Sequence, residues 1–122
     1  MRIAILILAF AATPAWAGWE KAATSPNGTF YLDHGTIHKN GDLRQAWQVE
    51  DLTKKRPDGT MSVRTLREYD CKADKVRVVS ISDHDGGMAT GHAIHSSDKP
   101  GKWVAIPPST VISILSKVVC AN

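Results

Sequence analysis

The sequence predicts an α+β fold: an antiparallel sheet of about six strands in meander order, with one C-terminal helix packed on a face. Two observations predict it. Between residues 19 and 106, short runs of apolar and β-branched residues alternate with turn signals, and no helical period lies between them. Residues 111–119 instead repeat their apolar side chains at helical spacing. Two cysteines, Cys71 and Cys120, offer a covalent link between these two parts.

We expect residues 1–17 to be a secretory signal peptide. Arg2 is the single basic residue before an uncharged apolar stretch at residues 3–12, and Ala-Trp-Ala at 15–17 supplies the small residues that signal peptidases read. The apolar stretch is too short to span a bilayer, which needs roughly 20 residues. Residues 18–122 are then one domain, exported to the periplasm or beyond. No cysteine follows the expected cleavage site, so we expect neither a lipid anchor nor stable membrane insertion.

The N-terminal half of the domain alternates strands with tight turns. Asn27-Gly28, between strands expected at residues 19–24 and 29–33, is a strong hairpin signal. A second turn at residues 39–42 leads into a strand at residues 43–52. Apolar side chains of that strand share one parity, as in a half-buried strand: Leu43, Trp47 and Val49.

The second half continues the meander. A strand at residues 61–71 places apolar side chains on one face, where Arg67 is a misfit. After a turn, residues 76–82 form a β-branched run, with residues 88–95 as its expected partner and residues 103–106 as a last short strand.

The expected helix begins after two prolines. Ser109 is in a position to cap its first turn. Its apolar face comprises Val111, Ile112, Leu115, Val118 and Val119. At about 100° per residue, Cys120 would point roughly 180° away from Val111. We therefore expect the helix to unwind near Val118 or Val119, so that Cys120 can reach the sheet.

The cysteine pair predicts a disulfide. An exported chain meets an oxidising compartment, where two cysteines normally form a bridge, and Cys71–Cys120 is the one pairing available. Closing a loop of about 50 residues stabilises the fold by roughly 4 kcal/mol in the chain-entropy model. The bridge would fasten the terminal helix to the middle of the domain.

Charge and motif patterns weigh against several functions. The 15 Lys and Arg residues are interspersed with 12 Asp and Glu residues, so no basic patch for nucleic acid emerges. The histidines lack zinc-site spacing, and we expect neither a metal nor another cofactor. No nucleophile elbow or phosphate loop is present, which argues against an enzyme.

Five aromatic residues are expected in the core, one in each of several strands: Trp19, Tyr31, Trp47, Tyr69 and Trp103. An exposed one would instead indicate a protein-binding surface, because Trp, Tyr and Arg dominate interface hot spots.

Short motifs follow one another in a particular order along the chain. They are Trp19 at the mature N-terminus, FYLD at 30–33, GDLRQAW at 41–47, EYDC at 68–71, SDKPGKW at 97–103, PPS at 107–109 and VC at 119–120. This order resembles the surface-adhesin protein E family of Gram-negative bacteria, over essentially the whole mature chain.

The resemblance implies the same sheet and helix, with Cys71 and Cys120 as the family's tethering pair. It also implies a non-enzymatic module that binds host extracellular-matrix or serum proteins, and it admits a homodimer. The family's adhesin is a lipoprotein on the outer surface, and the missing lipid-bearing cysteine is a departure from it. For ligand contacts we select two turns, at Lys54, Lys55 and Arg56 and at residues 83–87, where His84 and Asp85 lie.

Two alternatives stay open. One is a periplasmic structural or accessory protein that pairs through a sheet edge. The other is a small hydrolase that uses His92 or His95 with nearby Asp or Ser side chains.

Overall fold

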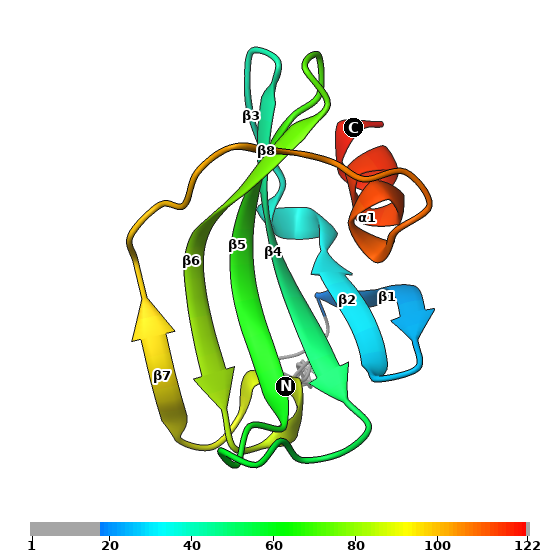
Figure 1. Ribbon diagram of the computed structural model, residues 1–122. Helices are drawn as coiled ribbons and strands as arrows, with labels where there is room; N and C mark the ends of the chain where they lie inside the picture. The colour runs from blue at the N-terminus through cyan, green and yellow to red at the C-terminus, as the bar shows by residue number, and fades with distance from the viewer. Residues whose placement is uncertain (1–17, 122) are drawn as a thin grey trace, which may run out of the picture.

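An antiparallel sheet of eight strands dominates the computed structural model, which describes residues 18–121. The expected signal peptide, residues 1–17, lies outside the described residues. The strands are β1 (Trp19–Ser25), β2 (Gly28–Asp33), β3 (His38–Asn40), β4 (Leu43–Leu52), β5 (Ser62–Asp70), β6 (Lys75–His84), β7 (Ala93–Ser97) and β8 (Val104–Ala105). Figure 1 shows them fanning from β1 at one edge to β7 at the other, with the helix α1 (Val111–Cys120) beside the β1 end.

The sheet has the predicted meander order, β1-β2-β4-β5-β6-β7. Two short strands lie off this path, because β3 pairs with β4 and β8 pairs with β6. Ser25 pairs with Gly28 at the first hairpin, as the Asn27-Gly28 signal predicted. The α+β prediction is therefore confirmed in its sheet and in its C-terminal α-helix.

The strand expected at residues 88–95 is wrong in its first half. A 3₁₀ turn, η2 (Gly87–Ala89), occupies that position, and β7 begins only at Ala93. Met88 and Ala89 have φ values of +54° and +59°, in the left-handed region, which cannot continue a strand. The last strand is likewise shorter than residues 103–106, because only Val104 and Ala105 pair with β6.

Side chains alternate between two faces of the sheet, which we call the helix face and the opposite face. The core lies on the helix face, where Ala46 of β4 and Tyr69 of β5 pack with Leu115 and Val119 of α1. The complete cluster is Phe30, Leu32, Ala46, Tyr69, Val76, Ile106, Leu115 and Val119. Arg67 shares the Tyr69 parity and is half-buried there, as the pattern predicted.

The aromatic prediction holds for one residue of five. Tyr69 is fully buried, whereas the other four are half-buried: Trp19, Tyr31, Trp47 and Trp103. Trp47 follows Ala46 and therefore points away from the helix, onto the opposite face.

Helix α1 begins one residue later than predicted. Thr110 is the N-cap: its Oγ1 accepts a hydrogen bond from Ser113 N (3.2 Å), and Ser113 Oγ accepts one from Thr110 N (3.1 Å). This capping box satisfies two backbone donors at once. Ser109 instead has a left-handed φ of +61° and belongs to the approach to the helix.

The expectation that α1 unwinds before Cys120 is wrong. The helix runs through Cys120, and its buried residues are Leu115, Ser116 and Val119. Their centre lies about 90° around the helix from Val111, so Cys120 is at the edge of the buried face and not in solvent. The predicted bridge then forms without unwinding, with the Cα atoms of Cys71 and Cys120 5.7 Å apart. Neither this helix nor any other within residues 18–121 is long and apolar enough to cross a membrane.

Candidate functional site

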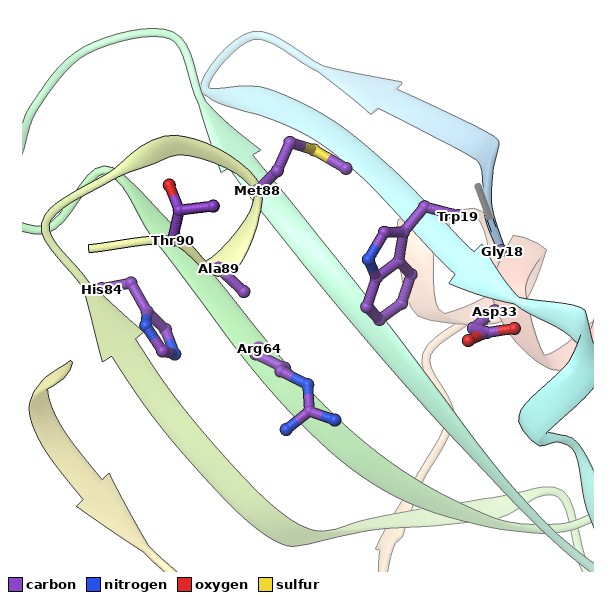
Figure 2. Close-up of a pocket in the computed structure, with 8 residues that line it drawn as sticks. All are labelled: Gly18, Trp19, Asp33, Arg64, His84, Met88, Ala89 and Thr90. Atoms are coloured by element: carbon purple, nitrogen blue, oxygen red, sulfur yellow. The ribbon is translucent and has the colours of Figure 1, made fainter. Parts of the chain in front are cut away.

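The opposite face carries a hollow of about 590 Å³, which we call the Arg64 hollow. Its lining residues are Gly18, Trp19, Asp33, Arg64, His84, Met88, Ala89 and Thr90. Figure 2 shows Arg64 between two walls, one formed by Trp19 and Asp33 and the other by His84 and the η2 segment. The hollow therefore joins the start of β1 to the start of β5 and the end of β6.

The guanidinium group of Arg64, which lines this hollow, lies over an aromatic ring. Its guanidinium carbon is 3.7 Å from the centroid of the Trp47 ring. Arg64 pairs with Val49, so Trp47 is its diagonal neighbour across β4 and β5. Such a cation–π contact stabilises by about 0.5 to 2 kcal/mol.

A second arginine of the same face, Arg77, has both an aromatic and a carboxylate partner. Arg77 lies over Trp103 at 4.7 Å from its centroid, and it also forms an ion pair with Glu68, with Nη2 at 2.7 Å and Nε at 2.8 Å from Oε1. Gln45 Nε2 donates to the other carboxylate oxygen of Glu68 (2.9 Å). Within residues 18–121, no carboxylate pairs with Arg64 in this way, so its N–H groups stay available.

The η2 wall is held in place by two side chains from the sheet. Met88 N donates to Asp51 Oδ1 (2.9 Å), and Ala89 N donates to Ser62 Oγ (2.8 Å). Ser62 Oγ in turn donates to Gly86 O (2.6 Å). Two consecutive left-handed residues without glycine cost of order 1 to 3 kcal/mol each, and these bonds offset the strain.

His84 forms the end of the same wall. Its Nε2 lies 2.8 Å from Ser82 Oγ, whereas its buried Nδ1 has no hydrogen-bond partner among the described residues. A serine and a histidine in contact are two parts of a hydrolytic triad, but a triad also needs a carboxylate on the other ring nitrogen. Asp58 lies instead beside His95, with 3.8 Å between Oδ2 and Nε2.

The predicted contact residues fall into two separate places. Lys54, Lys55 and Arg56 are exposed in the loop after β4, beside a smaller hollow of about 390 Å³. Arg56 there forms a long ion pair with Glu50, 3.5 Å between Nη2 and Oε1. His84 lines the Arg64 hollow, whereas Asp85 is engaged in closing its own turn, because its Oδ1 accepts from His92 N (2.7 Å).

Local sequence patterns did not predict the residues that define the Arg64 hollow. They placed Trp19 in the core and gave no indication that Arg64 lines a site. Their proximity depends on which strands pair and in which register, and no short-range signal contains that information. Within residues 18–121, no three His, Cys, Asp or Glu side chains gather as metal ligands.

Comparison with known proteins gives the family. The family model described as surface-adhesin protein E matches residues 19–121. This chain belongs to the surface-adhesin protein E family. No curated protein sequence matches the chain.

Solved structures of Haemophilus influenzae protein E share the adhesin E fold. Crystal form II is 18% identical with a TM-score of 0.68, and the alignment covers 91% of this chain and 93% of that one. Protein E from non-typeable Haemophilus influenzae is 19% identical with a TM-score of 0.65, covering 91% of this chain and 80% of that one. At such low identity the likeness shows a shared fold of sheet and helix. It carries no conclusion about the Arg64 hollow.

Proposed function

We propose that this chain is an exported, non-enzymatic module that binds protein ligands of the host, extracellular-matrix or serum proteins, through the face opposite the helix. Family membership supports an adhesin-like surface protein. The proposals that the ligand is a protein and that it binds the opposite face depend on the side chains of the Arg64 hollow.

One observation carries the proposal: two half-buried tryptophans lie on the opposite face together with an arginine that has no carboxylate partner among residues 18–121. Trp19 lines the hollow, and Trp47 supports Arg64 from below. Trp and Arg are enriched among interface residues that contribute most binding energy, chiefly where a partner excludes water from them. Lys54, Lys55, Arg56, His84 and Asp85 stay our predicted contacts, although of these five only His84 lines this hollow and the three basic residues line the separate hollow after β4.

Trp19→Ala tests the binding face. We expect at least about a tenfold loss of affinity for immobilised basement-membrane matrix or serum proteins, measured by biolayer interferometry on the mature protein. Ile114→Ala is the matched control, because Ile114 is a 45% exposed apolar residue of α1. Equal binding by both variants would contradict the assignment to this face, provided that circular dichroism shows both folded.

Cell fractionation tests where the protein acts. If it is an adhesin, it reaches the outer surface, where added protease and antibody can reach it in intact cells. Retention wholly in the periplasm would contradict the adhesin role and favour the accessory protein.

A homodimer is part of the proposal, and β7 supports it. This edge strand is mostly exposed and pairs with β6 at only four positions. A free strand edge can add a strand from another chain. Analytical ultracentrifugation should then show a dimer that Ile94→Pro abolishes, whereas a monomer at micromolar concentration would contradict this part.

A further inference from the structure

We propose that the Arg64 hollow is a carboxylate-binding site, which takes an acidic side chain of the protein ligand together with an apolar neighbour. This inference deepens the proposed function and rests on it. It follows from the geometry of Arg64, from the size and walls of the hollow, and from the charges that face it.

The free edge of the Arg64 guanidinium group is available to a ligand. Stacking on Trp47 occupies one flat side of the group and leaves its N–H donors in the plane unused. Arg77, which also lies over a tryptophan ring, uses these donors for the carboxylate of Glu68. Arg64 also lies over a tryptophan ring, but none of the carboxylates within residues 18–121 pairs with it as Glu68 pairs with Arg77. We therefore infer that the partner of Arg64 is a carboxylate of the ligand. The rigid, planar donors of arginine fit that group in a bidentate manner.

The hollow has room for more than a carboxylate group. A volume of about 590 Å³ far exceeds that of a single carboxylate. Trp19 and Met88 line the two sides with apolar surface, which suits the carbon chain of the acid and an adjoining apolar side chain. The hollow lies within the range of roughly 300 to 1,000 Å³ that is usual for ligand sites.

Two carboxylates lie near the hollow, and each accepts a hydrogen bond from the backbone. Asp33, on the far wall, uses Oδ1 to accept from Gly35 N (3.1 Å), where it caps the turn η1 (His34–Thr36). Asp51, which is not one of the lining residues, accepts a hydrogen bond from Met88 N. Among the side chains of the described residues that line the hollow, Arg64 carries the permanent positive charge.

Two matched peptides test the site. Acetyl-Leu-Glu-Leu-amide and acetyl-Leu-Gln-Leu-amide differ only in the carboxylate, and each is titrated into ¹⁵N-labelled mature protein while the indole N–H signals of Trp19 and Trp47 are followed. We expect the Glu peptide to bind about tenfold more tightly than the Gln peptide. Arg64→Gln should abolish this preference. Lys102→Gln, which removes one exposed positive charge elsewhere, should preserve it.

The outcomes separate this inference from the proposed function. Equal binding of the two peptides, or a preference that persists in Arg64→Gln, overturns the carboxylate site, even if Trp19→Ala still weakens binding to matrix proteins. A Glu preference that depends on Arg64 supports the site, even if no matrix protein binds. The dispersion of the amide and indole signals of Arg64→Gln shows directly whether this variant is folded. Arg64→Lys keeps the charge but not the planar donors, and an intermediate preference in this variant supports recognition by the guanidinium group.

A separate observation, at Gly18, carries a second inference. A β-carbon on Gly18 would lie 3.0 and 3.1 Å from the two carboxylate oxygens of Asp33. If cleavage after Ala17 frees the nitrogen of Gly18, rotation about its Cα–C bond can place the new ammonium group at that position, within hydrogen-bond distance. We infer that the processed N-terminus pairs with Asp33 and fixes the Trp19 wall of the hollow.

A double-mutant cycle tests this pair on the mature protein. N-terminal acetylation should lower Tm by about 2 to 5 °C in the wild type, because it removes the ammonium charge. In Asp33→Asn, which keeps an oxygen for the η1 cap, acetylation should change Tm by less than about 1 °C. Equal effects of acetylation in both proteins would overturn the pair, because they would show no interaction between the two groups.

Discussion

Tyr69 combines a fully buried side chain with a hydroxyl group that has no hydrogen-bond partner among residues 18–121. Burial disfavours the phenolate and raises the pKa of Tyr69 to about 12, although the neighbouring guanidinium of Arg67 acts in the opposite direction. Burial also lowers the pKa of Arg67 below its ordinary value, against the attraction of Tyr69 and Glu50. The ring of Tyr69 therefore stabilises the core, whereas its hydroxyl group adds little.

Alkaline solution should destabilise the protein through Tyr69. In the unfolded chain the side chain ionises near its ordinary pKa of about 10, whereas the folded chain keeps the proton up to about 12. Between these values the unfolded state binds fewer protons, so the free energy of unfolding falls as the pH rises, by roughly 1 kcal/mol at pH 11.

Tyr69→Phe is the test of that pH dependence. The variant should stay within about 1 kcal/mol of the wild type at pH 7, because no hydrogen bond is lost. It should lose less stability than the wild type between about pH 8 and pH 11, measured as urea midpoints. Parallel curves for the two proteins would show that Tyr69 does not titrate as proposed.

At the scale of elements, α1 and the η2 turn depend on tertiary contacts more than on their own sequences. Helix α1 has ten residues, and helices shorter than about 12 to 15 residues are marginal in water. It is held by the burial of Leu115 and Val119 and by the disulfide at its last residue. The η2 turn is held by Asp51 and Ser62.

Replacing both cysteines by serine should lower the free energy of unfolding by about 3 to 4 kcal/mol, since the bridge closes a sequence separation of 49 residues. Hydrogen exchange should accelerate most in α1, because the helix loses its covalent attachment. Urea titration and exchange mass spectrometry check these two effects. Unchanged protection in α1 would show that packing alone holds the helix.

Ser62→Ala should release the η2 turn. The substitution removes the acceptor of Ala89 N and the donor to Gly86 O, and we expect a loss of about 1 to 3 kcal/mol. Amide exchange at Ala89 should increase, followed by NMR. Ser96→Ala, an exposed serine on β7, is the control, and a similar effect of both substitutions would contradict this role of Ser62.

At the scale of the molecule, the two faces of the sheet differ. The helix face holds the core, and the opposite face holds the Arg64 hollow. Substitutions on the two faces should therefore have different consequences.

Leu115→Ala tests this difference. Leu115 is fully buried in the core, so its truncation should lower the free energy of unfolding by about 2 to 4 kcal/mol. At a temperature where the variant is still folded, its affinity for immobilised matrix or serum proteins should equal that of the wild type. A combined loss of stability and affinity would place the helix face in the binding site.

Alternation within strands, the Asn27-Gly28 hairpin, the helical period near the C-terminus and the number of cysteines are local properties, and they were sufficient to predict the α+β fold and the Cys71–Cys120 bridge. Register, by contrast, is set by pairing between distant segments, and it decided that Arg64 lies over Trp47. The same holds for the buried side of α1: its direction depends on what the helix packs against, and this allowed Cys120 to reach Cys71 without unwinding. A pattern along the chain specifies which side chains share a face, but only the folded sheet specifies which of them meet.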